Sequence, residues 1–273
     1  MPYGLKDAPL HFQCSMNLLL ADLLDKCILV YMDDILIYSN TAEEHFAHVK
    51  MVFEHLAARN WHVQEKRRAL FLPEVEFLGH MVSAVGVNVA VDKADAVVLW
   101  PTLMCVCEVQ GFLGLANFYR RFIKGFATIA KPLTNLMKKA IEFKWEATEE
   151  AAFEALKKAL TTAPILQVFD EEKPHEVWVD VLDYAVGATF MQPSNDGKTW
   201  LPVEYLSHRL SVAEQNYDAT NREFIAILSA LKRWRHYLLG THFIVRSNHA
   251  SLQWLQSQLQ LSWRQVRTLE FCS

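Results

Sequence analysis

The chain has 273 residues, of which 52% are hydrophobic and 21% are charged, and its formal net charge is −4. This length and composition allow two domains with filled cores and exclude a disordered or fibrous protein. The charge is unevenly distributed. Residues 117–139 carry six basic side chains and no acid, residues 142–183 carry eleven acids against four lysines, and residues 222–267 carry seven basic side chains and one acid. Such blocks are typical of solvated surfaces, but two basic stretches also suit a polyanion.

The cysteines and the hydropathy pattern indicate where the protein is found. The five cysteines are scattered and lack the paired spacing of a zinc site, which indicates reduced thiols. No apolar run approaches the roughly 18–20 residues of a membrane span, and the first residues do not resemble a signal peptide. We therefore expect a soluble protein of the cytoplasm or nucleus, with no membrane partner.

The first third of the chain predicts an α+β layer. Proline at position 9 suits the first turn of a helix that Asp7 would cap, and Thr41 and Glu44 form a capping box before a second helix. Between these helices, two β-rich runs are separated only by Asp33 and Asp34, which predicts a tight hairpin. The expected elements are a helix over 7–25, strands over 28–32 and 35–39, a helix from 42 to about 60, and strand-like pieces at 61–63, 69–72 and 75–82.

The remaining two thirds predict helices first and then an α/β domain. The expected elements are helices over 92–139 with breaks at 100–101 and 131–132, a helix over 146–160, a junction at 161–164, strands over 176–180, 185–192, 203–207 and 242–246, a helix over 221–239, and another from 251. Trp234 and Tyr237 lie beside leucines at helical spacing, so the core is the expected place for them rather than a stack of bases. Lys232, Arg233 and Arg235 fit either a nucleic-acid contact or a polar helix face.

Asp33 and Asp34 stand side by side inside an otherwise apolar, β-branched run. Two adjacent like charges are costly to bury unless a cation or a turn accounts for them. The residues alone leave two interpretations open. The pair is a solvated hairpin tip, where Asp is common, or it is a pair of hard oxygen ligands that holds Mg²⁺ in a cleft for phosphoryl transfer.

Motifs along the whole chain resemble the reverse transcriptases of gypsy-class LTR retrotransposons. They are YMDD between apolar strands, MPYGLKDAPLHFQ before it, VEFLGH after it, and then FLGLANFYRRFIKGFATIAKPLTNLMKK, FDEEKPHEVWVDVLDYAVGATFMQ, YLSHRLSVAEQNYDATNREFIAILSALKRWRHYLLG and VRSNHASLQWL. The resemblance implies an α+β fold in three parts. Residues 1–90 would form a partial reverse-transcriptase palm (hairpin plus helices), residues 91–164 a helical thumb and connection, and residues 165–273 a ribonuclease H-like α/β domain.

The resemblance also implies the site residues and the partners. The catalytic and metal-binding acids would be Asp33 and Asp34 in the palm and Asp180 and Glu223 in the ribonuclease H-like domain, with two Mg²⁺ ions, or Mn²⁺ in their place. The residues that contact nucleotide and template would be Tyr3, Gly4, Gln13, Tyr31 and Met32. The primer grip would be Phe77, Leu78, Gly79 and His80, and Arg120, Arg121 and Lys124 would contact the nucleic-acid backbone.

The implied function is RNA-directed DNA synthesis with hydrolysis of the hybrid. The implied partners are an RNA template, a DNA primer, an RNA–DNA hybrid and dNTPs, together with other polyprotein domains or a second reverse-transcriptase subunit. In the family's order, a third metal-binding Asp and the fingers precede Met1, and a further Asp follows Ser273.

Asn248 stands where the family has an Asp, so it keeps one oxygen ligand but removes a negative charge. We therefore expect weak or no activity from the isolated chain. Two alternatives stay open: a non-catalytic remnant that binds template–primer, and a subunit that completes an intact polymerase in trans.

Overall fold

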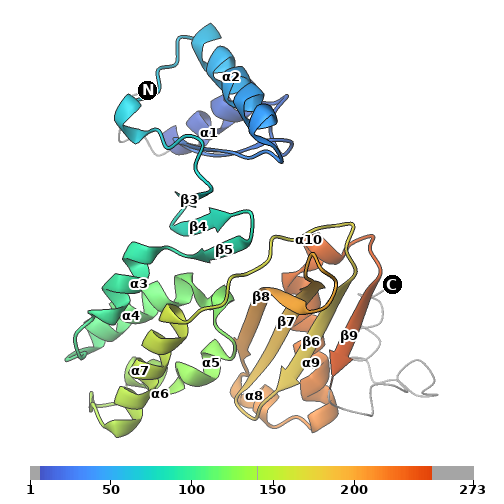
Figure 1. The fold of residues 1–273 in the computed structure, drawn as a ribbon. Coiled ribbons are helices and arrows are strands. Elements are labelled where there is room, and N and C mark those ends of the chain that lie inside the picture. Colours follow the sequence, from blue (N-terminus) through green and yellow to red (C-terminus); the bar gives the residue numbers. More distant parts are fainter. Residues whose placement is uncertain (1–6, 140, 248–273) are drawn as a thin grey trace. The chain divides into compact units, whose positions relative to one another are not determined.

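The computed structural model describes residues 7–139 and 141–247, and the chain folds as two compact units, Met1–Ala84 and Val85–Ser273 (Figure 1). Each unit combines helices with antiparallel strands, so the predicted α+β class is confirmed. No described helix combines the length and the hydropathy that a membrane span requires. The predictions at Tyr3, Gly4 and Asn248 and in the helix from 251 lie outside the described residues.

The first unit is built on two helices and two hairpins. Its elements are α1 (Ala8–Leu19), β1 (Ile28–Tyr31), β2 (Asp34–Ile37), α2 (Ala42–Ala58), the 3₁₀ turn η1 (Glu65–Arg67), β3 (Glu74–Phe77) and β4 (His80–Ser83). A small core joins α1, β1 and α2 through Met16, Leu20, Ile28, Val52 and Leu56. Thr41 caps α2 as predicted, because its side chain accepts a hydrogen bond from the Glu44 N–H at 3.2 Å, but the predicted capping box is incomplete, because the Glu44 carboxylate accepts from the Asn40 N–H at 3.3 Å and not from Thr41. Asp7 makes no such bond at α1.

Three strand predictions in this unit are wrong. Residues 61–63 and 69–72 form no strand, and the run 75–82 is a hairpin rather than one strand. The Arg68 guanidinium donates to the Val63 carbonyl at 2.7 Å, so that carbonyl is bonded outside a ladder. Phe71 has φ +57°, which an extended strand does not allow. The bonded Val63 carbonyl and the left-handed conformation of Phe71 therefore explain why neither segment is a strand.

The second unit begins with a strand and a helical bundle. Its elements are β5 (Gly86–Val89), α3 (Val91–Val98), α4 (Val106–Phe118), the 3₁₀ turn η2 (Arg120–Phe122), α5 (Phe126–Ile129), α6 (Lys131–Leu136) and α7 (Ala147–Thr161). The predicted breaks are present, because α3 ends before Trp100 and α6 begins with Pro132 in its first turn. The bundle core is aromatic: Phe112 and Phe153 are fully buried, with ring centroids 4.7 Å apart.

A four-stranded sheet follows in the order β8-β7-β6-β9. Its elements are β6 (His175–Val181), β7 (Ala185–Pro193), β8 (Trp200–Arg209), α8 (Val212–Gln215), α9 (Ala219–Arg233), α10 (Arg235–Leu238) and β9 (Phe243–Ser247). Strands β6, β7 and β8 are antiparallel neighbours, whereas β9 runs parallel to β6, and α9 packs on the sheet (Figure 1). The predicted single helix over 221–239 is two helices. Trp234 lies at the break, fully buried and stacked on Phe190 at 5.3 Å.

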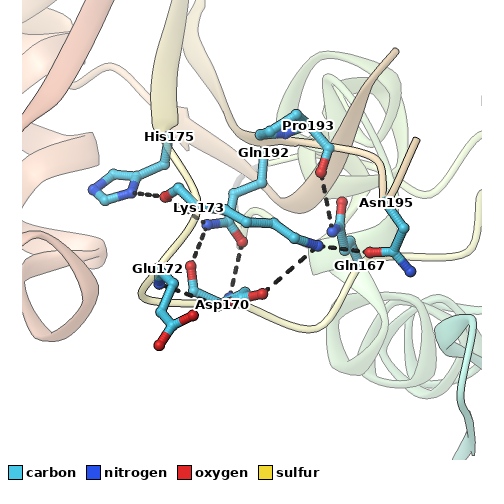
Figure 2. Close-up of polar contacts among 8 residues, drawn as sticks. All are labelled: Gln167, Asp170, Glu172, Lys173, His175, Gln192, Pro193 and Asn195. Carbon is cyan, nitrogen blue, oxygen red and sulfur yellow. Dashed lines mark hydrogen bonds and ion pairs between the residues drawn. The ribbon is translucent and has the colours of Figure 1, made fainter. Parts of the chain in front are cut away.

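A buried glutamine fixes the segment that leads from the helical bundle into β6 (Figure 2). Gln192 at the end of β7 is 0% exposed, accepts a bond from the Asp170 N–H at 3.0 Å and donates to the Asp170 carbonyl at 2.7 Å. The Lys173 ammonium reaches across to Asn195 Oδ1 at 2.7 Å and to the Asp170 carboxylate at 3.7 Å. These bonds tie the segment before β6 to the far end of the β7 strand.

Candidate functional site

The acid pair lies at the tip of the β1–β2 hairpin. Tyr31 pairs with Asp34, so the two turn residues are Met32 and Asp33, and Asp34 is the first residue of β2. The prediction that only the two acids separate the strands is therefore wrong by one residue. Both carboxylates are solvent-exposed, and the side chains of Tyr31 and Met32 beside them are also exposed. The tip thus presents two acids and two large apolar side chains to the outside of this unit.

Gln13 of α1 holds this turn in place. The Met32 N–H donates to Gln13 Oε1 at 2.6 Å, and Gln13 Nε2 donates to the Val30 carbonyl at 3.1 Å and to Asn17 Oδ1 at 2.8 Å. Met32 has φ +50°, in the left-handed region that costs a non-glycine residue about 1–2 kcal/mol. One helix side chain therefore bonds both the strained turn and the strand before it. Gln13 was predicted to contact nucleotide or template, and its role in holding the turn has no signal in the sequence.

The predicted primer-grip residues form the second hairpin. Phe77 pairs with His80, and the turn between them is Leu78-Gly79, with φ +51° and +73°. Two consecutive positive φ values are typical of a type I′ turn, which favours glycine at its second position. The Leu78 side chain is exposed, while Phe77 and His80 are half-buried. The sequence motif Phe77–His80 is thus a tight hairpin tip with one apolar side chain directed to solvent.

In the second unit, Asp180 and Glu223 approach the same end of the sheet. Asp180 is exposed near the end of β6, and Glu223 of α9 is 7% exposed. The Ser247 hydroxyl of β9 donates to Glu223 Oε2 at 2.9 Å, and Ser247 lies opposite Val179, the neighbour of Asp180. Arg222 pairs with the exposed Asp183 carboxylate at 2.8 Å beside this end. The sequence analysis missed Ser247, although it immediately precedes Asn248.

The carboxylate oxygens of the two predicted sites are chemically suitable ligands for a hard cation such as Mg²⁺. They do not form a complete set of ligands by themselves. Mg²⁺ prefers carboxylate, carbonyl and water oxygens in octahedral geometry. In the ranges 7–139 and 141–247, no three His, Cys, Asp or Glu side chains form a group that could hold a metal ion. Each predicted site thus contributes two carboxylates from the described residues.

The three residues predicted to contact the nucleic-acid backbone lie in different environments. Arg120 donates to the carbonyl of Ser207 on β8, and the Ser207 hydroxyl accepts from the Ala127 N–H at 2.9 Å. Arg121 lies over the Phe122 ring at 5.9 Å, and its buried Nε has no hydrogen-bond partner within the described ranges. Lys124 is exposed. Arg120 therefore has a bond within the chain, to the outer strand of the sheet.

Comparison with known families agrees with this fold. Residues 1–82 match the family described as reverse transcriptase (RNA-dependent DNA polymerase), and residues 145–245 match the RNase H-like domain found in reverse transcriptase. The chain belongs to the reverse transcriptases that carry an RNase H-like domain. More particularly, it is similar to the corresponding region of retrotransposon polyproteins, so the resemblance expected from the sequence is confirmed.

Two curated relatives show this similarity. The chain is 39% identical over 258 residues to the retrovirus-related Pol polyprotein from transposon 297 of Drosophila melanogaster, which covers 94% of this chain and 24% of that protein. It is 36% identical over 254 residues to the transposon Tf2-3 polyprotein of Schizosaccharomyces pombe, covering 92% of this chain and 19% of that protein. The chain thus spans a quarter or less of the length of these relatives.

Two solved structures of a foamy viral protease-reverse transcriptase share the fold. One, named dRH and in complex with ds DNA, has a TM-score of 0.87 and 27% identity, over 99% of this chain and 48% of that chain. The other, in complex with RNA/DNA hybrid, has a TM-score of 0.85 and 27% identity, over 100% of this chain and 37% of that chain.

Proposed function

We propose that this chain forms the part of a retrotransposon reverse transcriptase that holds template–primer and supplies Asp33 and Asp34 as ligands of the catalytic metal ions. The activity is RNA-directed DNA synthesis from dNTPs, with Mg²⁺ or Mn²⁺. The observation that supports it is the exposed acid pair at a hairpin tip whose strained turn Gln13 holds. Positioned hard oxygens are what phosphoryl transfer requires, because the bound metals neutralise the developing charge.

The other hairpin and the neighbouring side chains have binding roles in this proposal. Tyr31 and Met32 are exposed beside the acids, where they can contact the nucleotide and the template. The exposed Leu78 lies at the second hairpin tip, where it can contact the primer. The foamy viral complexes with ds DNA and with RNA/DNA hybrid support nucleic acids of both kinds as ligands. Tyr3 and Gly4 were also predicted from the sequence to contact nucleotide and template, and they keep this role in the proposal.

The ribonuclease H-like domain hydrolyses the RNA strand of the hybrid in this proposal, with Asp180 and Glu223 as metal ligands. Ser247 orients the Glu223 carboxylate through its hydroxyl bond. We assign residues 1–90 to the palm, 91–164 to the thumb and connection, and 165–273 to the ribonuclease H-like domain. We propose that the protein acts in the cytoplasm or nucleus, with other polyprotein domains or a second subunit as partners.

The metal role of the acid pair is tested by Mn²⁺ titration of the ¹⁵N-labelled chain. We expect paramagnetic broadening of the backbone amide signals of Tyr31–Asp34 at the lowest Mn²⁺ concentrations, and its loss in an Asp33→Asn/Asp34→Asn variant. The matched control is Asp22→Asn/Asp25→Asn, which removes two other exposed acids of the same unit. Broadening at the tip that survives in the first variant, or disappears equally in the control, contradicts the proposed metal site.

The reaction itself is tested by primer extension on an RNA template with Mg²⁺. Extension that disappears in Asp33→Asn supports the proposed role of the pair, and extension that survives this substitution contradicts it. The weak or absent activity expected of the isolated chain stays a prediction that the same assay measures.

A further inference from the structure

Two histidine side chains and one serine hydroxyl meet where β2 leads into α2 in the first unit. The Ser39 hydroxyl lies 2.7 Å from His48 Nδ1 and 3.2 Å from His45 Nδ1. His45 and His48 are three residues apart on α2 and share a face of the helix, and Ser39 follows the end of β2. All three residues are half-buried. We call Ser39, His45 and His48 the β2–α2 histidine site.

Hydrogen bonding alone makes the two imidazole rings unequal. A hydroxyl carries one proton, so Ser39 can donate to only one of the two Nδ1 atoms, and the other Nδ1 must carry a proton and donate to the oxygen. A metal ion at this point removes the difference, because both Nδ1 atoms then offer it a lone pair. The same three atoms can therefore form either a hydrogen-bonded network or a set of three ligands, and the two differ in where the histidine protons lie.

The spacing of the three atoms suits one cation. Zinc bonds imidazole nitrogen at about 2.0–2.1 Å, so two ligands of a tetrahedral ion lie roughly 3.3 Å apart. The two distances from Ser39 Oγ, 2.7 and 3.2 Å, are within roughly 0.6 Å of this value. The third donor is a hydroxyl, so the site is not one of the groups of three His, Cys, Asp or Glu side chains, of which the described ranges contain none. Water would take the remaining position, as it does in open zinc sites.

The surroundings of the site also favour a bound cation. Glu43 and Glu44 in the first turn of α2 offset the partial positive charge of the helix N-terminus. Phe71 packs edge-on against the His45 ring, with the centroids 5.1 Å apart and the planes at 81°. A ring that is already held by packing loses less rotational freedom when it binds a ligand. One of the two imidazoles is therefore fixed before an ion arrives.

We propose that the β2–α2 histidine site binds Zn²⁺, or a divalent ion of the same ligand preference, through His45 Nδ1, His48 Nδ1 and the Ser39 oxygen. Imidazole nitrogen suits Zn²⁺, Cu²⁺ and Ni²⁺, whereas carboxylate oxygen suits Mg²⁺. The site thus differs in kind from the acid pair at the hairpin tip. The bound ion joins the end of β2 to the first turns of α2, and because it binds only the folded chain it raises the melting temperature. The inference does not depend on the proposed function.

The test measures Zn²⁺ binding to the whole untagged chain by isothermal titration calorimetry, near neutral pH and with excess Mg²⁺ to occupy the carboxylates. One saturable site is expected. Ser39→Ala, His45→Gln and His48→Gln should each weaken binding by at least about tenfold, because even the loss of an outer-shell partner of a metal ligand costs about 10–100-fold. The matched control is His55→Gln on the same helix, because His55 Nδ1 is bonded to the Met51 carbonyl at 2.8 Å. It is expected to leave the affinity unchanged.

Histidine side-chain ¹⁵N spectra of the unsubstituted chain identify the ligand atoms, so the proposal stays testable even where a variant does not fold. Before Zn²⁺ is added, one Nδ1 of the pair carries a proton and the other does not. With Zn²⁺ bound, both rings carry only the Nε2 proton, and both Nδ1 signals shift together.

Four outcomes overturn the proposal. They are the absence of saturable binding, full affinity in a His45→Gln/His48→Gln variant, an equal loss in His55→Gln, and Zn²⁺ shifts at Nε2 of the pair instead of Nδ1. An Asp33→Asn/Asp34→Asn variant is expected to bind Zn²⁺ like wild type, which separates this test from that of the acid pair.

Discussion

Gln13→Met tests how the hairpin tip is held. The substitution keeps a side chain of similar length and removes the amide that bonds the Met32 N–H at 2.6 Å and the Val30 carbonyl at 3.1 Å. Both freed groups lie near the exposed tip, so water can replace the lost partners. We therefore expect local opening of the turn rather than unfolding of the unit, whose core contains Ile28 but not Gln13.

The size of the effect follows from the two lost bonds. A typical intramolecular hydrogen bond contributes about 0.5–1.5 kcal/mol net, so the turn should open more easily by about 1–3 kcal/mol. This corresponds to about fivefold to 150-fold faster exchange of a protected amide. The left-handed φ of Met32 favours opening further once the bonds are gone.

Hydrogen exchange of the Met32 amide, measured by NMR, is the assay. Asn17→Ala is the control, because it removes the Gln13–Asn17 bond and leaves both hairpin bonds in place. An unchanged Met32 rate in Gln13→Met, or the same acceleration in Asn17→Ala, would refute the assignment of Gln13 as the residue that holds the tip.

Three further changes concern the second unit. Gln192→Ala removes a fully buried amide with three bonds and should cost about 1–3 kcal/mol; an unchanged melting temperature in calorimetry would contradict this. The Arg246 hydrogen bond, and then that of Trp178, hold the pKa of the buried Glu176 below its ordinary 4.5. The ionised form therefore stabilises the fold above pH 4.5, and this contribution is lost as the pH falls below that value, so Glu176→Gln should flatten the melting profile on the acid side of pH 4.5; an identical profile argues against it. Gly86→Ala should destabilise by about 3 kcal/mol in urea unfolding, because the new Cβ would lie 2.2 Å from the Leu166 carbonyl oxygen; equal midpoints would show the reasoning to be wrong.

Periodicity and capping residues were enough to predict most elements. Thr41 and the apolar positions after it predicted α2, and the strands expected at 176–180, 185–192 and 242–246 match β6, β7 and β9 to within about two residues. These signals are local: a cap acts within one turn, and alternation follows from which side of a strand is buried. The same local signals misplaced the strands at 61–63 and 69–72, where the backbone lacks a partner strand within the described residues.

The turn at the acid pair shows a limit of a different kind. The sequence places Asp33 and Asp34 together, and turn statistics favour both as turn residues. The observed turn is Met32-Asp33, with a methionine in the left-handed region. The deciding contact comes from Gln13, 19 residues earlier in the chain. A tertiary hydrogen bond of this length has no signature in local sequence, so the register could be resolved only with the structure.

Charge alone also fails to predict what a basic residue contacts. Arg120 and Arg121 are neighbours in one basic block, yet Arg120 bonds a backbone carbonyl of β8 and Arg121 lies on Phe122. An edge strand exposes unpaired carbonyls that favour pairing with other chains unless something covers them. Arg120 satisfies one such carbonyl, and in doing so it brings its segment beside Arg233 and Glu204. The bond that covers this carbonyl therefore also brings Arg120 beside the ion pair of Arg233 and Glu204, and neither contact can be read from the local charge of the sequence.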